Sequence, residues 1–92
     1  MRSIIDYKIE LSSRAQSNLF QIEFYIDNFI DKMLDRISIL ENQPYIGKIY
    51  NQIIYNNRVL IHNKYLIFYE IKENENTILI KSVLNDRRNI KY

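Results

Sequence analysis

Basic side chains in the C-terminal part of this 92-residue chain are the residues best suited to bind an anionic group. They are Arg58, Lys81, Arg87 and Arg88. Arginine and lysine donate charge-assisted hydrogen bonds to phosphate and carboxylate groups. For Arg87 and Arg88 we favour a binding role over a solvated charge pair near the chain end. Arg58 is either a recognition residue or the cross-strand partner of Glu10 or Glu70.

Two more side chains, His62 and Tyr92, have the chemistry for proton transfer. His62 is the sole histidine, and imidazole exchanges protons near neutral pH. It precedes Asn63-Lys64, however, so we favour a turn residue over a general base. Tyr92 is able to stack on a base or donate a proton, but a frayed chain end is the favoured interpretation. Lys81 is either a phosphate contact or an ordinary surface residue.

The composition predicts one domain, residues 1–92, that needs no cofactor. Hydrophobic residues make up 47% of the chain, which is enough for a core, and the net charge is only +2. The absence of cysteine and the single histidine exclude disulfides and a His/Cys metal site. No apolar run is long enough to span a membrane, and the first residues do not read as a signal peptide. We therefore expect a cytoplasmic protein.

The first third of the chain predicts a strand followed by a helix. Tyr7–Leu11 alternates apolar and charged residues, as a half-buried strand does. Ser13 and Gln16 have the spacing of a capping box, so a helix is expected to begin there. Apolar residues at intervals of three and four then form one helical stripe: Ala15, Leu19, Ile22, Ile26 and Phe29.

A second apolar stripe, shifted by about one residue, follows the first. It comprises Ile30, Met33 or Leu34, Ile37 and Leu40. Asp27-Asn28 marks the shift, where the chain either turns back or continues as one kinked helix; we favour an antiparallel hairpin. This second helix must end before Pro44, and Gly47 is expected to supply the turn beyond it.

The remaining residues predict a sheet. Gln52–Tyr55 is either a short edge strand or a loop, and two hairpin turns, at His62–Lys64 and Glu73–Asn76, separate three strands. The strands are Arg58–His62, Tyr65–Ile71 and Thr77–Val83. The expected fold is therefore α+β in the order β-α-α-β-β-β, with two helices on one face of a four-stranded antiparallel sheet. The other face is left open, and we expect the functional site there.

Several short motifs occur in an order that is specific to one group of proteins. They are Tyr7–Ala15, Ile22, Tyr25-Ile26, Leu40, Pro44–Gly47, Arg58, Tyr65–Tyr69 and Val83–Asn89. With these motifs, which span nearly the whole chain, the sequence resembles the RelE/ParE superfamily of toxins from bacterial type II toxin–antitoxin systems. The resemblance implies a partner antitoxin and a toxin–antitoxin hetero-oligomer. It also implies one of two targets: ribosome-bound mRNA, which RelE-type toxins cut, or DNA gyrase, which ParE-type toxins bind.

Two positions favour the ParE-like branch. Relatives with ribonuclease activity usually carry an arginine where this chain has Leu66, and a histidine is common at the position of Asn85. At the second position an amide replaces the imidazole, and an amide cannot exchange a proton near pH 7. The leading expectation is therefore gyrase binding through Arg58, Lys81, Arg87 and Arg88. The alternatives are a ribonuclease that uses Arg87, Arg88, Tyr92 and His62, and a non-toxic protein that only binds its antitoxin.

Overall fold

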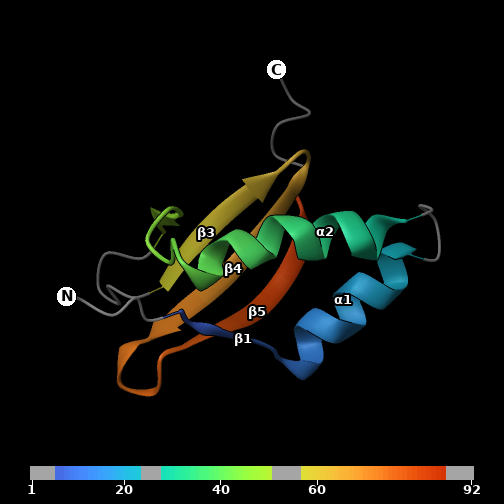
Figure 1. Ribbon diagram of the computed structural model, residues 1–92. Coiled ribbons are helices and arrows are strands. Elements are labelled where there is room, and N and C mark those ends of the chain that lie inside the picture. Colours follow the sequence, from blue (N-terminus) through green and yellow to red (C-terminus); the bar gives the residue numbers. More distant parts are fainter. Residues whose placement is uncertain (1–5, 24–27, 51–56, 87–92) are drawn as a thin grey trace.

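The structure, a computed structural model, describes residues 6–23, 28–50 and 57–86 and has an α+β fold (Figure 1). Its elements in chain order are β1 (Lys8–Leu11), α1 (Ser13–Glu23), α2 (Phe29–Ser38), the 3-10 helix η1 (Ile39–Glu41), β2 (Lys48–Ile49), β3 (Asn57–His62), β4 (Tyr65–Lys72), the 3-10 helix η2 (Glu73–Glu75) and β5 (Thr77–Asn85). The predicted strand or loop at Gln52–Tyr55 lies outside the described residues. No helix in the described ranges is long and apolar enough to cross a membrane.

The sheet has five strands in the order β1-β5-β4-β3-β2, and one pair is parallel. The expectation of four antiparallel strands is therefore wrong in two respects. The two-residue strand β2 is too short to show an alternating pattern, and β1 pairs with β5 in parallel. The parallel pair arises because the chain returns from the helices to the start of β1, where Tyr7 N–H donates to Glu41 O at 2.7 Å. Strand β3 therefore runs in the same direction as β1, β4 runs back, and β5 again runs in the direction of β1.

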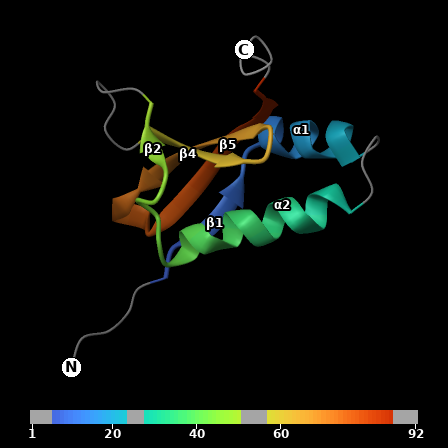
Figure 2. The ribbon, with the colours of Figure 1, turned by 90° about the horizontal axis from the view of Figure 1, so that it is seen from above.

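Two separate helices cover one face of the sheet, as the favoured hairpin predicts. They run in opposite directions and contact each other (Figure 2). Asn28 adopts a left-handed conformation, with φ 60°, directly before α2, so Phe29 begins the second helix instead of closing the first stripe. The helical residues buried in the core are Ala15, Leu19, Phe29, Met33 and Ile37.

The N-cap of helix α1 is Ser12, whereas the capping-box spacing of Ser13 and Gln16 predicted Ser13. The Ser12 hydroxyl accepts a hydrogen bond from Ala15 N–H at 3.0 Å, which is the geometry of an N-cap. The same hydroxyl donates to the carbonyl oxygen of Lys81 in β5 at 2.9 Å. With these two hydrogen bonds, Ser12 caps the start of α1 and joins it to the sheet.

Strand β5 contains a bulge at Lys81. Ile80 lies opposite Tyr69 and Ser82 lies opposite Phe68, so Lys81 is an extra residue without a partner on β4. Such a bulge interrupts the backbone ladder. Two side chains from the start of the helix layer bind the backbone here. The Ser12 hydroxyl donates to Lys81 O at the bulge, and Asn18 Oδ1 of α1 accepts from Val83 N–H, two residues later, at 3.0 Å.

The alternation predicted for Tyr65–Ile71 is confirmed. Ile67, Tyr69 and Ile71 belong to the core under the helices, whereas Leu66 and Phe68 face the other side of the sheet. Both expected turns are present, and each uses an asparagine with positive φ: 55° at Asn63 and 50° at Asn76.

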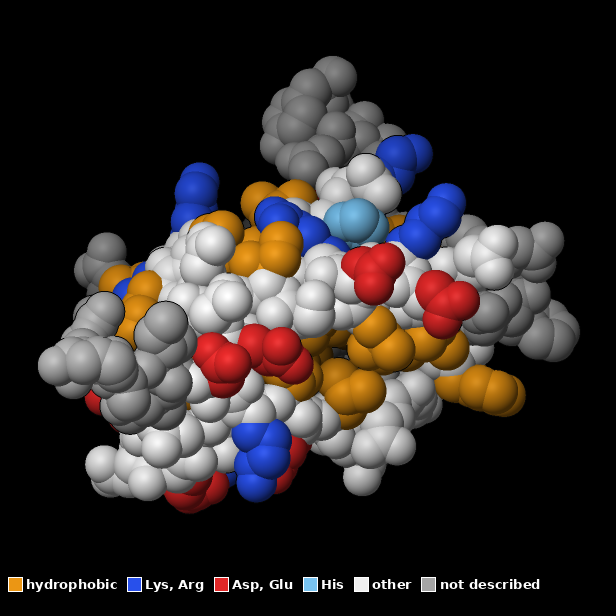
Figure 3. All heavy atoms as spheres, viewed as in Figure 1, with side chains coloured by type: hydrophobic (Ala, Val, Ile, Leu, Met, Phe, Trp, Pro, Cys, Tyr) orange, Lys and Arg blue, Asp and Glu red, His pale blue; other side chains and the backbone are white. Residues whose placement is uncertain are grey.

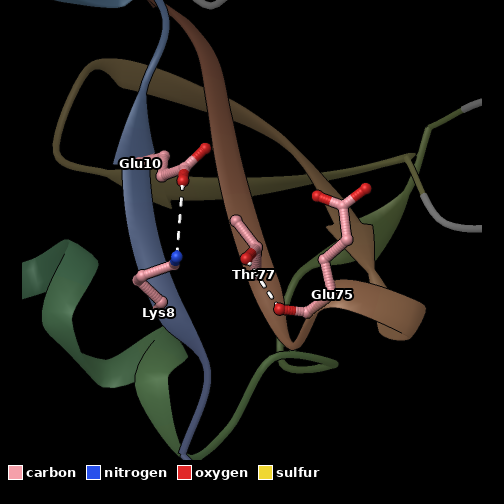
Figure 4. Close-up of polar contacts among 4 residues, drawn as sticks. All are labelled: Lys8, Glu10, Glu75 and Thr77. Atoms are coloured by element: carbon pink, nitrogen blue, oxygen red, sulfur yellow. Dashed lines mark hydrogen bonds and ion pairs between the residues drawn. The ribbon is translucent and has the colours of Figure 1, made fainter.

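The edge strand β1 carries a charged pair on its exposed side. Lys8 Nζ lies 3.7 Å from Glu10 Oε2 (Figure 4). Beside it, Thr77 Oγ1 donates to Glu75 O at 2.9 Å where β5 begins. Charged side chains of this kind discourage the pairing of an exposed edge with another chain. Glu10, which we considered as a partner of Arg58, thus pairs with its own strand neighbour.

We predict that replacing Ser12 destabilises the fold far more than replacing Ser13. Ser12→Ala removes the cap of α1 and leaves the Lys81 carbonyl without its donor, which should lower the free energy of unfolding by about 1–2 kcal/mol. Ser13→Ala is the matched control and should change it by less than about 0.5 kcal/mol. Urea unfolding of the two variants measures both values, and equal losses would show that Ser12 does not hold the bulge.

Candidate functional site

The open face of the sheet, opposite the helices, contains a groove of about 610 Å³. Its lining residues come from β2 to β5 and the residues that follow β2 and β5: Lys48, Tyr50, Val59, Ile61, Leu66, Phe68, Leu84, Asn85 and Asp86. The strand register explains the grouping, since Val59 lies opposite Phe68, and Leu66 lies between Ile61 and Leu84. This is the face on which the site was expected.

The groove is built mainly from apolar and aromatic side chains. The ring of Tyr50 packs edge-on against Phe68, with centroids 5.0 Å apart. Leu66 and Asn85, the two positions that depart from the ribonuclease pattern, both line this groove. Such a surface is suited to binding an apolar segment of a partner, and at these two positions it offers neither a cation nor a proton donor.

Lys81 is the candidate cation that the structure places on the open face. The bulge directs Lys81 and Ser82 to the same side of β5. The Lys81 ammonium lies 3.4 Å from Asn57 Oδ1, so a neutral amide and not a carboxylate contacts it there. Its positive charge therefore remains available to a partner, and its role in target binding stays a prediction.

Arg58 lies on the opposite side of the sheet from the one expected. It pairs with Tyr69 on the core face of β3 and is only 8% exposed. Its Nη1 donates to the backbone oxygens of Tyr45, at 3.1 Å, and Gly47, at 2.8 Å. Its guanidinium also lies 5.0 Å from the centroid of the Tyr45 ring. Arg58 therefore holds the loop Pro44–Gly47 against the sheet, which the sequence did not indicate.

Tyr69 binds the same loop from β4. Its hydroxyl donates to Pro44 O at 2.7 Å and accepts from Gly47 N–H at 3.0 Å. A Cβ on Gly47 would lie 2.6 Å from that hydroxyl and 2.8 Å from the backbone oxygen of Val59. Gly47 has no positive φ, so glycine is required here for close approach and not for a left-handed conformation.

The contacts of Arg58 and Tyr69 define a loop clamp, the loop Pro44–Gly47 with these two side chains. At the outer side of the loop, the Tyr45 hydroxyl donates to the Glu73 carboxylate. That hydrogen bond raises the pKa of Tyr45 above its ordinary value, and burial raises the pKa of Tyr69. Because β2 follows the loop directly, the loop clamp positions Lys48 and Tyr50 at the groove.

The other candidate residues lie away from the groove lining or outside the described ranges. His62 is the last residue of β3, and its Nε2 lies 3.5 Å from Nδ2 of Asn63 in the turn. The favoured assignment of His62 to the hairpin turn is thus supported by its position. Arg87, Arg88 and Tyr92 lie outside the described residues, so their roles stay predictions.

Two comparisons with known proteins agree with this arrangement. Residues 9–90 match the model of the family described as the ParE toxin of type II toxin–antitoxin systems. The fold is similar to a chain of the RelBE2 toxin–antitoxin complex from Mycobacterium tuberculosis, with a TM-score of 0.69 and 17% sequence identity. That alignment covers 88% of this chain and 99% of the other. No curated protein sequence matches the chain significantly.

We predict that the hydroxyl of Tyr69 is a major source of stability. Tyr69→Phe leaves the buried Gly47 N–H and Pro44 carbonyl without their partner, which should lower the free energy of unfolding by about 2–3 kcal/mol. Tyr65→Phe is the control on the same strand and face, and it should cost less than about 0.5 kcal/mol. Chemical denaturation compares them; a small loss for Tyr69→Phe would contradict the loop clamp.

The raised pKa of Tyr69 also predicts a loss of stability in alkali. The unfolded chain releases this proton near the ordinary pKa of 10.0, whereas the folded chain retains it. The stabilisation is therefore complete below pH 10 and is lost as the pH rises toward the folded-state pKa, by up to about 1.4 kcal/mol per pH unit. Thermal melts between pH 8 and 11 should show a smaller alkaline decline for Tyr69→Phe than for Tyr65→Phe.

Proposed function

Because the chain belongs to the ParE toxin family of type II toxin–antitoxin systems, we propose that it inhibits bacterial growth by binding DNA gyrase. In this proposal it performs no chemistry of its own and acts in the cytoplasm. The family match over residues 9–90 supports the proposal, since gyrase is the target that resemblance to ParE implies.

The composition of the open-face groove is the observation that carries the proposal. Cleavage of RNA by its 2′-hydroxyl needs a base for that hydroxyl, a cation for the phosphate and an acid for the leaving oxygen. This groove contains Leu66 at the position where ribonuclease relatives usually carry arginine, and Asn85 at the position where histidine is common in the superfamily. An apolar lining instead favours the binding of a protein surface.

Basic side chains are the proposed contacts with the target. Lys81 lies on the open face, and Arg87 and Arg88 follow Asp86, which lines the groove. Arg58 was also expected to contact the target, but its guanidinium binds the loop Pro44–Gly47. Its proposed contribution is therefore indirect, through the position of that loop.

We further propose that a cognate antitoxin neutralises the protein in a toxin–antitoxin hetero-oligomer. The fold resembles a chain from the RelBE2 toxin–antitoxin complex over nearly the whole of both chains, which supports a partner of this kind. The groove, with its apolar lining, would accept an apolar segment of the antitoxin.

A ribosome-dependent ribonuclease is the second candidate. The structural match to a chain of the RelBE2 complex favours it, because RelE-type toxins cut mRNA on the ribosome. In that case Arg87, Arg88, Tyr92 and His62 would have to supply the cations and the proton transfers. His62 is in the β3–β4 turn region and is not among the residues that line the groove.

Pulse labelling after induction in a bacterial host distinguishes the two functions. We expect thymidine incorporation to fall before methionine incorporation, and purified protein to inhibit supercoiling by gyrase. Replacing Arg87 and Arg88 together by alanine should weaken this inhibition at least tenfold, whereas Lys72→Ala, at the other end of β4, should not change it.

The opposite labelling order would favour the ribonuclease, especially if Arg87→Ala and Tyr92→Ala each abolished mRNA cleavage. If neither synthesis changed while an antitoxin still bound, the protein would be a non-toxic relative. If the variant without Arg87 and Arg88 inhibits gyrase as strongly as the unmodified protein, these two residues do not contact the target.

A further inference from the structure

Basic and polar side chains that are not part of the groove lining gather beside it at one end of the molecule. We call this set the basic tip: Arg36 in the last turn of α2, and His62, Asn63 and Lys64 at the β3–β4 turn. Arg36 Nη2 donates to the backbone oxygen of Ile61 at 3.3 Å, which holds α2 against the end of β3. Figure 3 shows Lys and Arg side chains around the histidine on this face, with acidic side chains beside them.

The two permanent charges of the basic tip have no ion-pair partner within the described part of the chain. Arg36 and Lys64 form no ion pair there, whereas Lys8 and Glu10 do so on the distant edge strand. The acids closest in sequence or contact are Asp35 and Asp86. Asp35 is exposed beside Arg36 in the chain, and Asp86 is buried and donates its N–H to Lys64 O at 2.6 Å.

The chemistry and shape of the basic tip favour a phosphate backbone as its ligand. A guanidinium, an ammonium, an imidazole and an amide side chain are groups that proteins use to contact phosphates. Three of them belong to the β3–β4 turn, which is the outer end of a hairpin (Figure 1), and this position suits an extended polyanion.

We propose that the basic tip binds the sugar–phosphate backbone of duplex DNA, independently of base sequence. This inference rests on the proposed function, because gyrase holds the duplex that the tip would contact. The groove and the basic tip are then two separate surfaces: the groove binds protein, and the tip binds the DNA beside it.

Fluorescence anisotropy with a labelled 20-base-pair duplex and the purified chain, without gyrase, tests the proposal. We expect weak binding whose affinity falls with salt at a slope of about −2 to −4 in log–log form, since each phosphate contact adds about 0.9 to the slope. Lys64→Gln and Arg36→Gln should each weaken binding about five- to tenfold at 0.1 M salt and reduce the slope by about 1. Lys72→Gln, at the opposite end of β4, is the matched control and should leave both unchanged.

Because Arg36 also joins α2 to β3, a melting curve is needed for its variant, whereas the side chain of Lys64 has no such role. The proposal is overturned if Lys72→Gln weakens binding as much as Lys64→Gln, or if the duplex does not bind at 50 mM salt. A clear preference for an RNA duplex of equal length would assign the tip to ribosomal RNA instead. If the unmodified protein binds the duplex but does not inhibit gyrase, the proposed function alone is rejected. If it inhibits gyrase but does not bind the duplex, the tip alone is rejected.

Discussion

The hydrogen bonds of Tyr69 and Arg58 with the loop Pro44–Gly47 are the interaction on which the candidate site depends. These two residues lie opposite each other on neighbouring strands and bind three backbone oxygens and one N–H of a single loop. Backbone groups of an irregular loop need such partners when they are buried. Because the loop leads directly into β2, the same contacts determine where one wall of the groove lies.

This clamp also gives a physical reason for motifs that are far apart in the sequence. Gly47, Arg58 and Tyr69 resemble superfamily positions, and in the structure they are in direct contact. Glycine is needed because Tyr69 and the Val59 backbone occupy the space of a Cβ. All three residues therefore act together in holding the loop Pro44–Gly47 against the sheet.

The sheet and helix pattern could largely be predicted from the sequence, whereas features that depend on distant contacts could not. The alternation in Tyr65–Ile71 predicts a strand because successive side chains point alternately to the core and to the open face of the sheet. The face of Arg58 was assigned wrongly because a charged residue is normally exposed, and the loop oxygens that accept its hydrogen bonds come from residues 11 and 13 positions earlier. Ser12 and Ser13 are equally good caps by type, and only the carbonyl of Lys81 distinguishes them.

The bulge at Lys81 has a consequence for the length of β5. The residues before it and after it each alternate correctly against β4, with Ile80 opposite Tyr69 and Ser82 opposite Phe68. Removing Lys81 would therefore leave an uninterrupted strand in which every remaining side chain keeps its face. The pairing of β4 with β5 does not require this residue. What it adds is a backbone oxygen for the first turn of α1 and an ammonium group on the open face, so a single inserted residue serves both the helix layer and the surface opposite to it.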